Sequence, residues 1–150
     1  MSNCKTCELT QRRDREEAPL WDSILRTPGW DVVHSYNTAL EGWLVLVVRR
    51  HITALAELTV DEAGELGPLI QSVSAALHQV TGCEKTYLAQ FAEHPDHRHV
   101  HVHLVPRDPD HPPEARGPEV FSLLGDSAEA QVSEHRMNEI AEELRRVLVE

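Results

Sequence analysis

The sequence has no apolar run long enough to cross a membrane, and its first residues lack the apolar stretch of a signal peptide. Basic residues are few: 14 Lys and Arg stand against 25 Asp and Glu, for a formal net charge of -11. A protein that binds nucleic acid needs clustered positive charge to neutralise the phosphates. We therefore expect a cytoplasmic protein with neither a membrane nor a nucleic-acid partner.

Cysteine is scarce as well. With three cysteines, an odd number, a disulfide framework is less favoured than reduced thiols or thiolates that bind a metal. Two of them stand as Cys4-x-x-Cys7, which is compatible with a redox pair, half of a zinc site or two idle thiols. The redox interpretation lacks the strand-then-helix setting of such motifs. Cys83 has no partner at ligand spacing and is expected to be a packing residue.

The length of the chain predicts a single domain with one hydrophobic core over residues 1–150. Residues 11–17 are expected to form a short polar lead. Apolar residues at helical spacing predict three helices, at residues 19–27, from the capping box at Thr59 to Gly82, and at about 133–149.

Runs rich in Val, Leu and aromatics predict four strands, at residues 30–36, 43–49, 86–92 and 99–105. The second is almost wholly apolar and is therefore expected in the centre of a sheet, and Pro106 is expected to end the last. The prolines and charges of residues 108–118 predict an irregular surface loop. The order of strands, long helix and further strands indicates an α+β fold with helices on an antiparallel sheet.

Three histidines alternate with apolar residues in the last of these strands, as His99-Val100-His101-Val102-His103. Because successive side chains of a strand point to opposite faces, the imidazoles share one face and the valines share the other. The apolar face is expected to pack against the long helix. The other face then carries three imidazoles in a row.

Three interpretations of this row are open. A solvated face is possible because His tolerates partial exposure, but three adjacent histidines make it the least favoured. Metal binding is possible because His-x-His presents two nitrogens to one zinc ion. Chemistry on phosphate is possible because neutral imidazole is a nucleophile and protonated imidazole donates to phosphate oxygens.

The residues around this strand resemble a known family. The chain contains His99-Val100-His101-Val102-His103-Leu104-Val105-Pro106-Arg107, which is similar to the signature of the histidine triad superfamily, His-φ-His-φ-His-φ-φ with φ apolar. The Pro-Arg that follows is common in its nucleotide-hydrolysing, fragile-histidine-triad-like branch, and small bacterial members are also similar. Upstream, Gly42-Trp43-Leu44-Val45-Leu46-Val47-Val48-Arg49-Arg50-His51 resembles the second signature strand.

The resemblance covers about residues 4–107 and extends only weakly over residues 108–150. It implies an antiparallel sheet of about five strands, with a long helix on one face and a C-terminal helix. It also implies a nucleotide phosphohydrolase or nucleotidyl transferase that acts on a nucleoside phosphoanhydride, ester or phosphoramidate.

By the same resemblance, His101 would attack phosphorus and form a covalent nucleotidyl-histidine, which water or another acceptor resolves. His103 would hold phosphate oxygens as charge develops, and His99 is likewise assigned to the substrate site. Asn37 lies in the loop where relatives contact the ribose.

Some branches of the superfamily hold a structural zinc ion with a cysteine pair, a histidine that ends the second signature strand, and the first histidine of the triad. The matching residues here are Cys4, Cys7, His51 and His99. The resemblance therefore implies a closed Cys2His2 site that fastens the N-terminus to the sheet. Relatives of this size usually form two-fold dimers, so a homodimer is expected.

Two positions depart from the family pattern. Trp43 follows Gly42 where many relatives have a histidine that supports the triad, and Pro95 stands where hydrolases carry a phosphate-contacting Gln. His97, with His94 nearby, is a candidate for the missing donor, although histidines in a polar loop are often merely solvated. Two alternatives to the covalent histidine mechanism remain: a nucleotide-binding or interaction module with weak or no catalysis, which these departures would permit, and a catalytic zinc ion at the triad itself.

Overall fold

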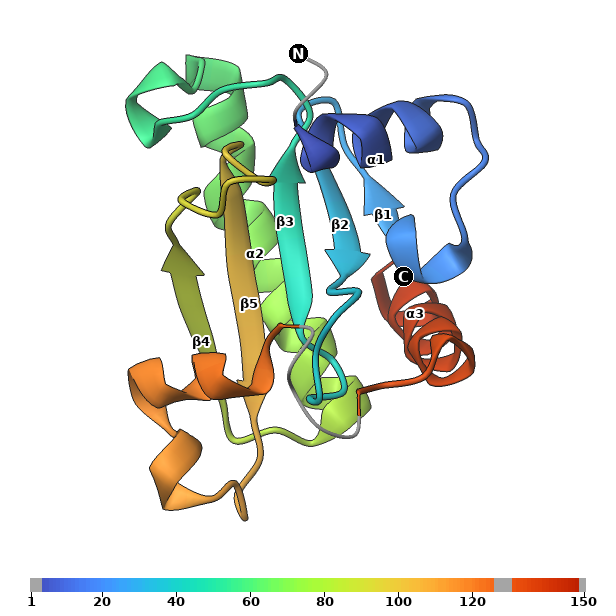
Figure 1. The fold of residues 1–150 in the computed structure, drawn as a ribbon. Coiled ribbons are helices and arrows are strands. Elements are labelled where there is room, and N and C mark those ends of the chain that lie inside the picture. The colour runs from blue at the N-terminus through green and yellow to red at the C-terminus, as the bar shows by residue number, and fades with distance from the viewer. Residues whose placement is uncertain (1–3, 126–130, 149–150) are drawn as a thin grey trace.

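The fold is built on one antiparallel sheet of five strands in the order β1-β2-β3-β5-β4 (Figure 1). The computed structural model describes residues 4–125 and 131–148. Its strands are β1 (Leu25–Arg26), β2 (Trp30–His34), β3 (Leu44–Val48), β4 (Lys85–Gln90) and β5 (His101–Arg107). The predicted α+β fold and the central place of the apolar strand β3 are confirmed.

The long helix α2 (Val60–Thr81) lies behind the sheet in Figure 1. Its N-cap is Thr59, whose hydroxyl accepts a hydrogen bond from the Glu62 amide, while the Glu62 carboxylate accepts one from the Thr59 amide. It ends at Gly82, whose φ of 72° lies in the left-handed region that glycine adopts without strain. Both predicted ends of this helix are therefore confirmed.

A second helix, α3 (Glu134–Leu148), packs against α2. Residue 149 of the predicted range lies outside the described residues. The helices and the back face of the sheet enclose the main core, whose members include Trp30, Val32, Leu44, Leu46, Val48, Leu69, Val73, Leu77, Val100, Val102, Leu104, Ile140 and Leu144. The valines and the leucine that alternate with the triad histidines thus pack against the long helix, as predicted.

The front face of the sheet is covered by two shorter segments at opposite ends (Figure 1). Helix α1 (Lys5–Asp14) lies across one end, and the 3-10 helix η4 (Gly117–Leu123) lies across the other. A second apolar cluster, which includes Trp43 and Val105, fills the space beneath η4. The predicted irregular loop therefore contains ordered turns, first η3 (Pro113–Ala115) and then η4. A further 3-10 turn, η2 (Leu55–Glu57), precedes α2.

Helix α1 is a correction to the predicted polar lead. The periodicity rule misses it because the side chains that it buries are polar: Thr6, Thr10 and Arg13. Arg13 donates to Asp31 at 2.8 Å and to Asp22 at 2.9 Å, and all three side chains are buried. Ion pairs rather than apolar contacts therefore fix the C-terminal end of this helix.

Two further predictions are wrong in detail. The helix expected at 19–27 is only the 3-10 turn η1 (Leu20–Asp22). Its second half is extended instead, because Leu25 and Arg26 form β1, which pairs antiparallel with β2 after the turn at Thr27. Pro106 does not end β5, which continues to Arg107. Pairing of β5 with β3 stops at Leu104, so only β4 lies beside β5 at Pro106. The missing N–H of proline therefore removes no hydrogen bond to β3 at this position.

Candidate functional site

The triad histidines follow the predicted alternation along β5. His101 and His103 lie on the front face, in register with Val47 and Val45 of β3. His99 precedes the strand and is fully buried, whereas His101 is partly exposed. The two strand histidines line a pocket at the front of the sheet.

His101 has a defined neutral form. Its Nδ1 lies 2.7 Å from the backbone oxygen of His99, and because a carbonyl only accepts, Nδ1 carries the proton. The lone pair of the ring is then on Nε2. Burial lowers the pKa of His101, which favours this neutral form. The ring therefore has the electronic state that a nucleophilic imidazole requires.

His103 has a different partner. The indole N–H of Trp43 donates to His103 Nδ1 at 3.0 Å, and both side chains are buried. The Phe121 ring of η4 packs edge-on against His103, with centroids 5.1 Å apart. Burial, followed by the nearby His101 and His97, lowers the pKa of His103 to about 3. The position that departs from the family pattern thus supplies a hydrogen-bond donor in place of a supporting imidazole.

The pocket beside the two histidines has a volume of about 170 Å³. Its walls come from α1, from β2 and the loop after it, from β3, and from the loop before β5. Asn37, which sequence analysis assigns to the ribose, is among the lining residues, and His94 and His97 are also present. His99 is not among them, since its buried ring faces away into a second cluster.

His97 is held in the lining of this pocket by two hydroxyl groups rather than simply solvated. Its Nδ1 lies 2.7 Å from the Thr6 hydroxyl, and its Nε2 lies 2.9 Å from the Tyr36 hydroxyl. Burial, followed by the charges of His101 and His94, lowers the pKa of His97 to about 4. The ring stands 6.3 Å from the ring of His101, centroid to centroid. A loop histidine is thus held beside the triad by residues from two other elements.

Sequence analysis missed the contributions of α1 and of Tyr36. Thr6, Leu9 and Arg13 form one wall of the pocket, and Tyr36 lines it as well. The available signal for α1 is weak. Cys4 is an unusual N-cap, accepting the Cys7 amide through its sulfur, and Thr6, Thr10 and Arg13 recur at helical spacing.

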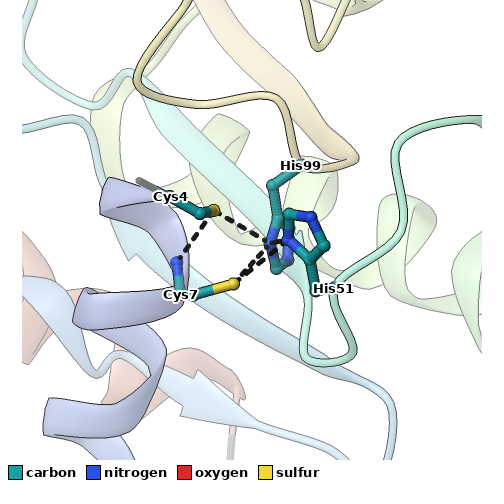
Figure 2. Close-up of side chains that lie close together, drawn as sticks. All are labelled: Cys4, Cys7, His51 and His99. Carbon is teal, nitrogen blue, oxygen red and sulfur yellow. Dashed lines mark hydrogen bonds between the residues drawn. The ribbon is translucent and has the colours of Figure 1, made fainter. Parts of the chain in front are cut away.

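A second group of side chains gathers where α1 begins, and Figure 2 shows its four members: Cys4, Cys7, His51 and His99. They come from the N-terminus of α1, from the segment after β3 and from the residue pair before β5. Their potential ligand atoms all lie within 4.8 Å of one another. The structure therefore brings together the four residues that sequence analysis names as metal ligands.

The geometry of this cluster fits a tetrahedral ion. Zinc bonds of about 2.0 Å to nitrogen and 2.3 Å to sulfur separate neighbouring ligands by roughly 3.3–3.8 Å. Cys7 Sγ lies 3.1 Å from His51 Nδ1 and 3.5 Å from His99 Nδ1. Cys4 Sγ lies 3.6 Å from His99 Nδ1, and the two Nδ1 atoms are 3.2 Å apart.

The donor set also fits. His99 Nε2 donates to the Val48 carbonyl at 2.6 Å, which leaves the Nδ1 lone pair directed at the cluster. Burial, followed by Cys4, raises the pKa of the Cys7 thiol to about 11, so a bound cation is needed to hold a thiolate there at neutral pH. Among residues 4–125 and 131–148, these four side chains form the group of three or more possible ligands that lie close enough to hold one ion.

The chain is an α+β protein with a row of imidazoles on the front of a five-stranded sheet and a long helix behind it. The family model of the HIT domain matches residues 22–110, more than half of the chain. The chain belongs to the HIT family. The match leaves out Cys4, Cys7 and the whole of α1.

Solved structures with the same fold cover almost the whole chain. A zinc-bound histidine triad family protein from Mycobacterium smegmatis is similar with a TM-score of 0.65 at 16% identity, over 97% of this chain and 93% of that one. A histidine triad protein from Bradyrhizobium japonicum has a TM-score of 0.68 at 23% identity, over 91% and 94%. A hypothetical histidine triad nucleotide-binding protein from Sulfolobus tokodaii has a TM-score of 0.69 at 14% identity, over 95% and 92%.

At these identities the likeness establishes the fold. No curated protein sequence matches the chain. Within the described part of the chain, no helix is both long and apolar enough to span a membrane.

Proposed function

We propose that the chain transfers a nucleoside-phosphoryl group through His101. The observation that carries this proposal is the hydrogen bond from His101 Nδ1 to the His99 carbonyl, which leaves the Nε2 lone pair on a ring that lines the pocket. Nε2 attacks phosphorus, a nitrogen–phosphorus bond forms, and the bond to the leaving group breaks. Water then attacks the same phosphorus, and the nucleoside monophosphate and the free imidazole are released.

The other pocket residues have supporting roles in this proposal. His103 donates to a phosphoryl oxygen as negative charge develops there. Asn37 contacts the ribose, and His97, which Thr6 and Tyr36 hold in place, contacts the phosphate where relatives use a Gln. The burial of His99 gives no support to its predicted substrate contact, so we assign His99 to the metal cluster alone.

We also propose that Cys4, Cys7, His51 and His99 bind a structural zinc ion. A closed set of four protein ligands leaves no position for substrate, so the ion supplies rigidity and no chemical step. It fastens the start of α1 to the segment that leads into β5. This matters for the pocket because Thr6 and Leu9 of α1 line it.

Replacement of the nucleophile tests the proposal. The purified chain is incubated with phosphoanhydrides, esters and phosphoramidates of adenosine and guanosine, and product release is measured together with the acid-labile label on the protein. His101→Asn is expected to lose both, by at least about 1000-fold in turnover, and to keep its folding and nucleotide affinity. His78→Asn, an exposed histidine on α2, is the matched control and is expected to retain wild-type turnover.

Two outcomes contradict the enzymatic proposal. Wild-type turnover in the His101→Asn protein excludes this residue as nucleophile. Tight nucleotide binding by the wild-type chain, without product or label from any compound, favours the nucleotide-binding module instead.

The homodimer is a further proposal. β4 is an edge strand, and two apolar side chains on or next to it are more than half exposed, Leu88 at 53% and Phe91 at 58%. Pairing of this edge with a second copy would cover both. Sedimentation at micromolar concentration should give twice the chain mass, and Leu88→Lys should shift the species toward the monomer.

A further inference from the structure

His101 and His103 are neighbours on one face of β5, yet they meet opposite kinds of partner. The Nδ1 of His101 faces a backbone carbonyl, which only accepts. The Nδ1 of His103 faces the indole N–H of Trp43, which only donates. The first partner requires a proton on Nδ1, and the second requires a bare Nδ1.

The bare Nδ1 of His103 determines where the neutral ring carries its proton. A neutral imidazole with a bare Nδ1 carries its proton on Nε2. A second proton on Nδ1 would point directly at the Trp43 N–H, 3.0 Å away from atom to atom, and would replace a hydrogen bond by a repulsion between two donors. Trp43 is fully buried, so no water is at hand to relieve that repulsion.

We infer that Trp43 is a positioning residue that holds His103 as a neutral imidazole with its proton on Nε2, so that His103 acts on the substrate as a neutral donor. This inference rests on the proposed function for the role of that donor, but the state of the ring can be measured without any substrate. The Nε2–H bond is kept throughout the reaction: His103 donates to a phosphoryl oxygen and transfers no proton.

The rest of the environment agrees with a neutral ring. The titratable groups that face His103 are His101 on its own strand and His97 in the preceding loop, and both act against a further positive charge. The neighbours from the other elements are uncharged: Val45 of β3, Ala89 of β4 and Phe121 of η4. Burial among these groups lowers the pKa of His103 in the same direction as the Trp43 contact.

The same geometry fixes the direction of the ring. Trp43 and His103 meet nearly at right angles, with an interplanar angle of 89°, and Phe121 packs edge-on against both. A ring flip of His103 would set Cδ2 against the indole N–H and break the bond. The donor therefore has a defined position as well as a defined charge.

Nitrogen-15 NMR of the histidine rings at neutral pH tests the first part. In the wild-type chain we expect Nδ1 of His103 unprotonated, Nε2 protonated, and a scalar coupling across the Trp43 N–H···N bond. Trp43→Phe should abolish the coupling and move the Nδ1 resonance. Trp30→Phe is the matched control, because Trp30 is equally buried and its indole N–H donates to the Glu62 carbonyl at 2.9 Å, away from the triad.

Kinetics test the second part with the compound that the wild-type chain turns over fastest. Trp43→Phe should lower kcat about tenfold, the effect of one lost hydrogen bond, with a smaller change in KM. Trp30→Phe should keep wild-type kcat. Trp43→His, whose ring can again donate to Nδ1, should recover kcat to within about threefold of the wild type.

Several results would overturn the inference. They are a protonated Nδ1 on wild-type His103, unchanged His103 resonances in Trp43→Phe, or a loss of kcat in that variant no larger than in Trp30→Phe. If Trp43→Phe does not fold, the inference is tested by the wild-type His103 resonances and by the kinetics of Trp43→His. Failure of the proposed function looks different, because it leaves no turnover in any variant while the ring state of His103 is still measured.

Discussion

The two faces of the sheet are held by different forces, and β5 belongs to both. On the back face, Val102 and Leu104 are buried in the apolar cluster that α2 and α3 complete. On the front face, His101 and His103 each have one hydrogen-bond partner and an opening to the pocket. We therefore expect stability to come mainly from the back of the strand and the proposed activity from its front, so substitutions on the two faces should separate the two properties.

Removal of the proposed zinc ion should break this comparison most strongly, because we expect the Cys2His2 cluster to stabilise the fold from the front side. A ligand present at 1000 times its Kd stabilises the folded state by about 4 kcal/mol, and we expect a loss of this size when a chelator removes zinc. Urea titration with and without chelator measures it, alongside hydrogen exchange of α1. Cys7→Ser should reproduce the loss.

Cys83→Ser provides the control for this experiment, since Cys83 is a buried thiol outside the cluster. It should not respond differently to the chelator than the wild type. An unfolding free energy that is the same with and without chelator would contradict a structural metal site.

Leu104→Ala sharpens the comparison from the back face. The side chain is 1% exposed in the main core, so its truncation should lower the free energy of unfolding by about 3 kcal/mol and leave kcat per folded molecule unchanged. Leu55→Ala is the matched control, because Leu55 is also a leucine but lies outside the main core and is 46% exposed. A fall in kcat in the Leu104→Ala protein at full folding would show that the two faces are coupled.

The smallest effect is expected at the cap of α2, where stability should depend on pH. Hydrogen bonds from Arg50, then the Thr59 amide, lower the pKa of Glu62 from 4.5 to about 2. Because the folded-state pKa is the lower one, this carboxylate stabilises fully above about pH 4.5, and its contribution disappears as the pH falls toward 2.

Glu62→Gln should therefore lower the free energy of unfolding by about 1 kcal/mol at pH 7 and flatten its dependence on pH between 4.5 and 2. Denaturant titrations at several pH values measure both. Glu142→Gln, an exposed acidic residue on α3, should change neither. An unaltered pH dependence in Glu62→Gln would exclude the cap as its source.

The back of the sheet was accessible to sequence analysis because apolar periodicity and local caps determine it. The capping box at Thr59, the stop at Gly82 and the alternation along β5 all concern near neighbours in the chain. Helix α1 was not accessible, because ion pairs of Arg13 with Asp22 and Asp31 take the place of an apolar stripe. The prediction of a single domain over residues 1–150 stays a prediction.

The candidate site likewise contains residues that a sequence motif names and residues whose role only the structure shows. The triad and the four possible metal ligands are named by a motif, and the structure brings the ligands within reach of one ion. The partners that set the chemistry are distant in sequence: Trp43 lies 60 residues from His103, and Tyr36 lies 61 residues from His97. A sequence pattern names such residues as departures from a family, but only the strand register and loop path show what they contact.

His99 contacts both the cysteine cluster, through its ring, and His101, through its backbone carbonyl. Its ring offers Nδ1 to the cysteine cluster and Nε2 to the Val48 carbonyl, while its own carbonyl accepts from His101. A shift of the whole residue would move the ring away from the cysteines and, at the same time, remove the carbonyl that fixes the tautomer of His101. The tautomer of His101 and the contact between the start of α1 and the sheet therefore depend on the position of the same residue.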